Sequence, residues 1–240
     1  MRREVVWIAG VAIALVLTGG ERIVAQQRDA AKINTTKVVA DLTAQGELDA
    51  HAVKAEVVTY RGQKAVRITD DAPGANDDTS RMAVVHDISM QDGTVQMRIS
   101  GDTVPNAPAS LRGFVGIAFR VSADSSRYEC IYLRPTNGRA DDQLRRNHST
   151  QYISVPGYPW EKLRTETPGV YESYVDLVPG EWTDVKIEFH GKEARLYVNG
   201  ATQPALIVHD LKQPVTPGGI ALWVGPGTLA HFADLHVTLP

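Results

Sequence analysis

FVGIAFRVSADSSRYECIYLRP, residues 114–135, is the stretch that decides the fold class of this chain. It contains two runs with an apolar residue at every second position, separated by the polar residues 122–126. Such a period of two predicts two antiparallel strands joined in a hairpin. The apolar set is Val115, Ile117, Phe119, Val121, Ile131 and Leu133. The hairpin predicts that Arg120, Tyr128, Tyr132 and Arg134 share the opposite face.

The period of two continues on both sides of this hairpin, in short segments bounded by glycine, proline, aspartate or asparagine. Predicted strands occupy residues 55–60, 65–69, 82–86, 94–100, 114–121, 128–134, 151–155, 171–178, 184–190, 194–199, 205–208, 220–224 and 230–239. So many short strands need two packed layers to cover their apolar faces. We therefore expect an all-β fold, a two-sheet antiparallel jelly-roll sandwich. Residues 32–44 fit either a helix or an edge strand.

Residues 1–25 have the pattern of a secretory signal peptide. Arg2 and Arg3 precede an apolar run over residues 5–17, and a candidate cleavage site follows at Ala25. The run is shorter than the ~18–20 apolar residues that span a bilayer.

We therefore expect a mature chain that starts near Gln26 and is secreted or periplasmic, with no membrane contact once the peptide is removed. Residues 26–240 would form a single jelly-roll domain, within which residues 26–50 have no clear pattern. No repeat or low-complexity tract divides this domain.

Composition excludes several kinds of partner and site. The net charge is −3 and no block of lysine or arginine occurs, so nucleic acid is not expected as a partner. Cys130 is the one cysteine, which rules out an internal disulfide and a cysteine-based zinc site. Its place in an apolar strand predicts a small buried side chain.

Most connections between the predicted strands are short, but two are long and polar: residues 136–150 and 156–169. They flank the predicted strand 151–155. Loops of this length are uncommon in a compact domain unless they bind a ligand or are disordered. Disordered segments are poor in aromatic residues, and these stretches contain Tyr158 and Trp160. We therefore expect the two loops to border a ligand site.

Four runs of sequence carry a resemblance to a known superfamily: GFVGIAFR (113–120), YECIYLRP (128–135), GEWTDVKIEFHGKEARLYVNG (180–200) and GGIALWVGPGTLAHFADLHV (218–237). With them the chain resembles the concanavalin A-like lectin/glucanase superfamily, including laminin-G-like domains and 3-keto-glycoside hydrolase-like jelly rolls. The resemblance implies two curved antiparallel sheets with ligands on the concave face and its bordering loops. It says little about activity, because this superfold hosts lectins, hydrolases, lyases and adhesion modules.

On that face, arginine and aromatic side chains are the candidates for ligand binding. The guanidinium groups of Arg120 and Arg134 suit carboxylates and sugar hydroxyls, although each could instead be the solvated end of a strand. Tyr128 and Tyr132 offer flat surfaces for a sugar ring, with core packing as the alternative. Trp160, in the second loop, could stack on a sugar.

The run RNHSTQY, residues 146–152, is the densest group of catalytic residue types. His148 could act as base, Tyr152 as acid and Arg146 as stabiliser of an acidic sugar, which is the division of labour in jelly-roll polysaccharide lyases. Asn147 is a further candidate for ligand contact, and Glu172 is the candidate carboxylate partner. The short lyase motifs and the Glu-x-Asp-x-x-Glu strand of jelly-roll glucanases are both absent.

The remaining expectations concern cofactors and function class. No cofactor is required, and no His-Glu-x-x-His spacing supports zinc. Because members of the superfamily often hold a structural calcium ion, the resemblance makes Asp234 a candidate calcium ligand. We expect an exported protein that binds an oligo- or polysaccharide on the concave face. A glycoside hydrolase or polysaccharide lyase using the same face, and a laminin-G-like protein-interaction module, remain the alternatives.

Overall fold

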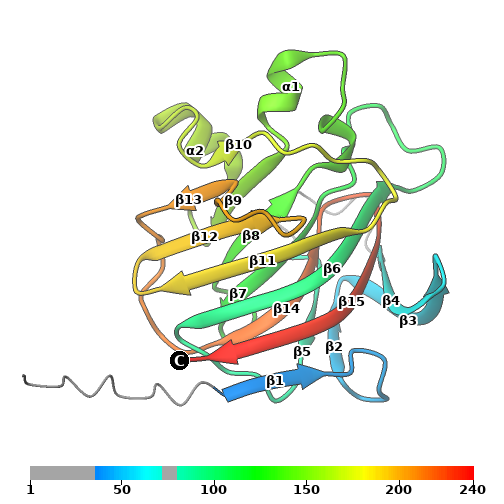
Figure 1. Ribbon diagram of the computed structural model, residues 1–240, viewed down its shortest axis with the longest axis vertical. Coiled ribbons are helices and arrows are strands. Elements are labelled where there is room, and N and C mark those ends of the chain that lie inside the picture. Colours follow the sequence, from blue (N-terminus) through cyan, green and yellow to red (C-terminus); the bar gives the residue numbers. More distant parts are fainter. Residues whose placement is uncertain (1–35, 72–79) are drawn as a thin grey trace, which may run out of the picture. The chain divides into compact units, whose positions relative to one another are not determined.

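A computed structural model describes residues 36–71 and 80–240, which form a pair of antiparallel sheets stacked face to face (Figure 1). The eight-stranded sheet has the order β13 (Leu206–Val208), β12 (Glu193–Val198), β11 (Thr183–His190), β6 (Gly93–Thr103), β15 (Thr228–Leu239), β4 (Gln63–Asp70) and β3 (Val53–Tyr60), with β1 (Thr36–Ala40) pairing with β15. The seven-stranded sheet has the order β10 (Glu172–Ser173), β9 (Thr150–Val155), β8 (Tyr128–Leu133), β7 (Val115–Val121), β14 (Gly219–Val224), β5 (Met82–Val85) and β2 (Leu48–His51). The predicted all-β jelly-roll sandwich is confirmed.

The hairpin predicted from residues 114–135 is formed by β7 and β8. Val115 lies opposite Leu133 and Ile117 opposite Ile131, so the apolar residues of both strands share one face. These side chains pack into the core between the sheets, where Ile187 and Phe232 of the other sheet are fully buried. The alternating pattern therefore reports directly which face of each strand is inside.

A β-bulge changes the direction of Arg120. The pairing of β7 with β14 shifts register at this residue, which adopts a φ of +52°. As a result Val121 packs in the apolar cluster on the outer side of the sheet. The Arg120 guanidinium instead lies 5.5 Å from the ring centroid of Phe189, a core residue of β11. The prediction that Arg120 shares a face with Arg134 is wrong, because a bulge exchanges inside and outside for the residues that follow it.

The face of the seven-stranded sheet that is turned away from the other sheet, called here the outer face, carries a continuous row of residues. Each member lies opposite the next in the strand register: Glu172, Gln151, Tyr132, Gly116, Trp223, Met82 and His51. Gly116 is required in this row, since a Cβ there would collide with the Cβ of Tyr132. The rings of Tyr132 and Trp223 meet beside it, with centroids 4.9 Å apart. The row places the edge residue Glu172 two strands from Tyr132.

Three expectations about secondary structure need correction or completion. Residues 171–178 do not form a long strand; only Glu172–Ser173 pairs, as β10. The two polar stretches each contain a short helix, α1 (Gln143–Asn147) and α2 (Trp160–Glu166), and η1 (Pro135–Asn137) follows β8. Some of the undecided segment 32–44 is the strand β1, paired along its length with β15.

The predicted signal peptide, residues 1–25, lies outside the described residues. Among the residues that are described, no helix is long and apolar enough to cross a membrane. Helices α1 and α2 and strand β10 lie at the same end of the sandwich (Figure 1), next to β9. The polar loops of the sequence therefore gather at one end of the seven-stranded sheet.

Candidate ligand-binding site

Arg134, the residue that follows β8, is the centre of a polar group at this end of the outer face. Its side chain is only 5% exposed. Its Nη2 donates to the Tyr132 hydroxyl at 2.9 Å and to Oε1 of Gln151 at 3.2 Å. Its Nε is buried and has no hydrogen-bond partner among the described residues. A buried guanidinium with an unused donor is costly for a protein to keep. Nη1 of Arg120 shares this property, so the candidate site at Arg134 depends on the side chains that surround it.

Glu172 supplies the carboxylate of this group. Arg164 of α2 donates to it twice, from Nε at 2.7 Å and from Nη2 at 2.6 Å. The Glu172 Oε2 is also 3.6 Å from Nη1 of Arg134 and 3.5 Å from Nε2 of His148. The two-pronged pair with Arg164 is the strong geometry for an arginine–carboxylate contact. Glu172 thus links α2, β8 and the end of α1.

His148 is the C-cap residue of α1, and its side chain is 19% exposed. Burial lowers the pKa of His148, and the charges of Arg164 and Arg134 act in the same direction, whereas Glu172 acts against them. The imidazole is therefore neutral at neutral pH, a state in which it can accept a proton. Its backbone carbonyl accepts from Nη1 of Arg134 at 3.4 Å, which ties the helix end to β8.

Aromatic rings surround the arginines. The guanidinium carbon of Arg134 lies 5.1 to 5.4 Å from the ring centroids of Phe114, Tyr132 and Trp160. Arg164 lies 4.4 Å from the centroid of Trp160. Cation–π contacts of this kind hold guanidinium groups in fixed positions. Burial raises the pKa of Tyr132 to about 12, so its hydroxyl stays protonated beside Arg134.

We call this group the Arg134 cluster and define it as Tyr132, Arg134, His148, Gln151, Trp160, Arg164 and Glu172. The structure brings together five side chains that the sequence singled out: Tyr132, Arg134, His148, Trp160 and Glu172. Sequence reasoning missed Gln151 and Arg164. The signal for Arg164 was its spacing of four residues from Trp160, which places both on one face of a helix once α2 is recognised.

Tyr152 does not belong to the Arg134 cluster, because it points into the core. It is fully buried, and its hydroxyl donates to Oε2 of Glu129 at 2.7 Å. The same hydroxyl accepts from the backbone N–H of Lys212 at 2.9 Å, and Glu129 Oε1 accepts from the N–H of Gln213 at 2.9 Å. The expected grouping of Tyr152 with His148 and Glu172 is wrong. Tyr152 alternates with Gln151 along β9, so it faces the core while Gln151 faces the Arg134 cluster.

Arg120 is also structural in its contacts, with a side chain that is 1% exposed. Its Nε donates to the carbonyl of Gln91 at 2.7 Å, and its Nη2 donates to Asp92 Oδ1 at 3.1 Å and to the carbonyl of Gly191 at 2.8 Å. These partners belong to two loops of the eight-stranded sheet side. Arg120 therefore ties loops together away from the Arg134 cluster.

The other predicted ligand residues do not join the Arg134 cluster, and Tyr128 begins the strand β8 that Arg134 follows. Tyr128 is buried on the outer face, and its hydroxyl is 3.2 Å from Oγ of Ser80. Arg146 donates from Nη2 to the hydroxyl of Tyr174 at 3.0 Å on the surface. Asn147 is exposed and accepts from Gln143 within α1.

Asp234 occupies a bulge of β15 with a φ of +54°, on the other sheet. Its carboxylate accepts from the amide nitrogen of Gln63, whose oxygen accepts from Arg98. Calcium takes six to eight oxygen ligands, and an amide N–H group and a neighbouring cation do not fit it. Within residues 36–71 and 80–240 no group of three or more His, Cys, Asp or Glu side chains is placed to hold a metal. Calcium at Asp234 therefore has no support beyond the resemblance.

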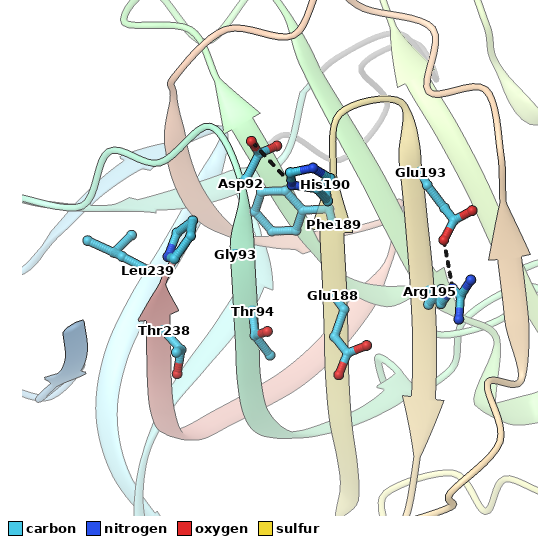
Figure 2. A pocket seen from close by; sticks show the side chains of 11 residues that line it. Asp92, Gly93, Thr94, Glu188, Phe189, His190, Glu193, Arg195, Thr238 and Leu239 are labelled. Atoms are coloured by element: carbon cyan, nitrogen blue, oxygen red, sulfur yellow. Dashed lines mark hydrogen bonds and ion pairs between the residues drawn. The ribbon is translucent and has the colours of Figure 1, made fainter. Parts of the chain in front are cut away.

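Two hollows lie on the outward face of the eight-stranded sheet, with volumes of about 420 and 400 Å³. Figure 2 shows the first, where Thr94, Glu188 and Arg195 line neighbouring strands. Its charged side chains are already paired: Glu193 with Arg195 at 2.7 Å, and Glu188 with Lys186, which lines the second hollow, at 2.6 Å. Such exposed pairs are weak and common on surfaces. We therefore place the candidate site at the Arg134 cluster and not in these hollows.

No protein-family model and no curated protein matches the sequence. Solved structures do resemble the fold. A Bacillus subtilis protein of unknown function with a galectin-like fold has a TM-score of 0.53 at 11% identity, covering 82% of this chain and 94% of its own. The apo Crh5 transglycosylase has 0.52 at 10% identity, covering 85% and 84%.

A third structure, the carbohydrate binding module CBM66 from Bacillus subtilis, has a TM-score of 0.50 at 12% identity and covers 78% of this chain and 95% of its own. These identities are too low to transfer an activity, and the likeness shows the fold alone, a two-sheet antiparallel sandwich. The fold predicted from the four sequence runs is thus confirmed.

Proposed function

We propose that this domain binds carbohydrate at the Arg134 cluster. The observation that carries the proposal is the convergence of arginine, histidine, glutamine, carboxylate and aromatic side chains from β8, β9, β10, α1 and α2 at one end of the outer face. Such a mixture of planar donors, acceptors and rings suits the hydroxyl groups and apolar faces of sugars. A carbohydrate binding module and a transglycosylase among the structural neighbours support the same class of ligand.

The proposal is tested by screening the purified domain on glycan arrays and then measuring affinity by calorimetry. The variant Arg164→Gln removes the most exposed guanidinium of the Arg134 cluster. Loss of one charge-assisted hydrogen bond of about 1.5–3 kcal/mol weakens binding roughly tenfold or more. The control is Arg195→Gln, because Arg195 is an exposed arginine paired with Glu193 on the opposite sheet. An equal loss in both variants, or no glycan bound, would contradict the proposal.

One observation favours cleavage of the bound sugar as a second candidate function. His148 is partly exposed, has a lowered pKa and lies 3.5 Å from the Glu172 carboxylate, so a neutral base is held beside a carboxylate in the site. Reducing-end and unsaturated-product assays on any glycan that binds would detect hydrolase and lyase activity respectively. If turnover occurs, His148→Ala should reduce the rate by ~100- to 10,000-fold while binding persists. Binding without turnover leaves the domain a non-catalytic module.

Export of the protein belongs to the same proposal, because extracellular polysaccharides are its expected ligands. It depends on the arginines and apolar run within residues 1–25. N-terminal sequencing of protein recovered from the medium or periplasm should find a start near Gln26. Retention of Met1 in the recovered protein would contradict it.

A further inference from the structure

The charges within the Arg134 cluster are not balanced. Arg134 and Arg164 both contact Glu172, and the third neighbour of that carboxylate, His148, is neutral at neutral pH because burial lowers its pKa. Two guanidinium groups therefore share one carboxylate, which leaves one positive charge in excess. In a site of low exposure an unpaired positive charge is costly unless a bound anion neutralises it.

Neighbouring arginines add to this positive field. The pKa of Arg112 is lowered by burial first and then by repulsion from Arg145 and Arg134. Arg145 itself donates to the Thr136 carbonyl at 3.1 Å and to Asn137, which are neutral groups.

The carboxylates around the cluster are otherwise engaged. Asp142, whose charge acts on the pKa of His148, accepts from the backbone N–H of Arg145 at 3.1 Å as the N-cap of α1. Asp176 is held by Nε and Nη2 of Arg139, at 2.7 and 2.8 Å. Neither neutralises Arg134 or Arg164 by a direct contact among the residues that the structure describes. The excess charge is therefore available to an incoming anion.

Arg164 presents the geometry for that anion. A guanidinium group has two edges that can each grip a carboxylate with two parallel N–H donors. Glu172 occupies the Nε–Nη2 edge of Arg164, and no described residue bonds to Nη1. The Arg164 side chain is 29% exposed, and none of its atoms is buried without a partner, so the Nη1 edge is open to solvent. Glu172 and the Trp160 ring hold this open edge in place.

We infer that the Arg134 cluster binds an acidic sugar, with the carboxylate of a uronic acid seated on the free edge of Arg164. The planar carboxylate of a uronate matches the two parallel donors, whereas a neutral sugar leaves the positive charge unpaired. The inference rests on the proposed carbohydrate binding and names its substrate class. It predicts affinity that falls as ionic strength rises, because the site is partly exposed.

The test compares polysaccharides that differ only in charge. Polygalacturonate, alginate and hyaluronan are each offered beside their carboxyl-reduced neutral forms, with cellulose and laminarin oligosaccharides as neutral glycans and dextran sulfate as a sulfated one. We expect at least one acidic polymer to bind ten times or more tightly than its reduced form. Equal binding of the reduced form, or binding of neutral glycans alone, overturns the inference and leaves the proposed function intact. Binding of dextran sulfate alone assigns the site to sulfate and also overturns it. Binding of nothing overturns both.

Two variants of Arg164 distinguish the contribution of its two-pronged hydrogen bonding from that of its positive charge. Arg164→Gln should lose the preference for the acidic polymer, and Arg164→Lys, which keeps the charge without the two-pronged fork, should recover only some of it. Arg195→Gln, on the opposite sheet, serves as the matched control and should bind as the unaltered protein does. Thermal unfolding of each variant checks that the domain is folded. Full acid preference in a folded Arg164→Gln protein would overturn the inference.

Discussion

Replacing Tyr152 by phenylalanine tests whether this residue is structural or catalytic. The change removes one hydroxyl that serves two partners, as a donor to the buried Glu129 carboxylate at 2.7 Å and as an acceptor for Lys212 N–H at 2.9 Å. Glu129 then keeps one described partner, the N–H of Gln213. The ring itself stays in its place in the core, so no large cavity forms.

The cost follows from these contacts. A hydrogen bond to a charged group contributes about 1.5–3 kcal/mol, and the abandoned Lys212 N–H adds a smaller amount because water can reach it to some extent. We expect Tyr152→Phe to lower the free energy of unfolding by roughly 3 kcal/mol. For a domain of this size that corresponds to a fall in Tm of about 6–12 °C.

The assay is urea unfolding followed by tryptophan fluorescence, with glycan binding and turnover measured on the same preparation. Tyr171→Phe is the matched control. Tyr171 packs against Tyr152 at 5.5 Å between ring centroids, but its hydroxyl donates to Asp210, whose side chain is 55% exposed. Its loss should cost about 1 kcal/mol or less. A Tyr152→Phe protein of nearly unchanged stability that has lost turnover or binding would refute the structural assignment.

Three further outcomes are expected. Burial, and then the charge of Arg67, lowers the pKa of His231 from 6.5 to about 4, so the unfolded chain takes up the proton first and stability falls as pH drops below 6.5. His231 should make the free energy of unfolding about 2 kcal/mol lower at pH 5 than at neutral pH. His231→Phe should reduce this dependence of stability on pH, and an unchanged dependence would contradict the role of His231. Arg120→Ala removes the guanidinium partner of Asp92, which keeps the Gly191 N–H at 2.8 Å, and should cost about 3 kcal/mol in urea unfolding without changing glycan affinity. A stable variant with weak binding would restore Arg120 as a ligand residue. Burial raises the pKa of the Cys130 thiol, so a thiol reagent should modify it only in denaturant, and rapid labelling of the native protein would disprove its burial.

Local sequence was sufficient for most of the strands and for several members of the site, but it missed β2 and made β10 too long. Alternation placed Tyr132 and Arg134 on one face because β-strand side chains alternate regardless of what packs on them. Glu172 was singled out as a carboxylate, but its neighbours were not predictable, since β10 is a two-residue strand that exists only through its pairing with β9. Arg164 was overlooked because its loop was not recognised as containing a helix.

The sequence by itself determined the all-β class and the hairpin at residues 114–135, and it marked the two polar loops as unusual, because periodicity and turn residues act between near neighbours. Only the tertiary structure decided which way Arg120 and Tyr152 point and which cations surround Glu172. Arg120 turns inward at a bulge where Gly218 lets two backbones approach, a Cβ there lying 2.5 Å from the carbonyl carbon of Arg120. Tyr152 on β9 contacts the buried Glu129 on the neighbouring strand β8. These are contacts between distant segments, and their energies depend on packing that no local pattern records.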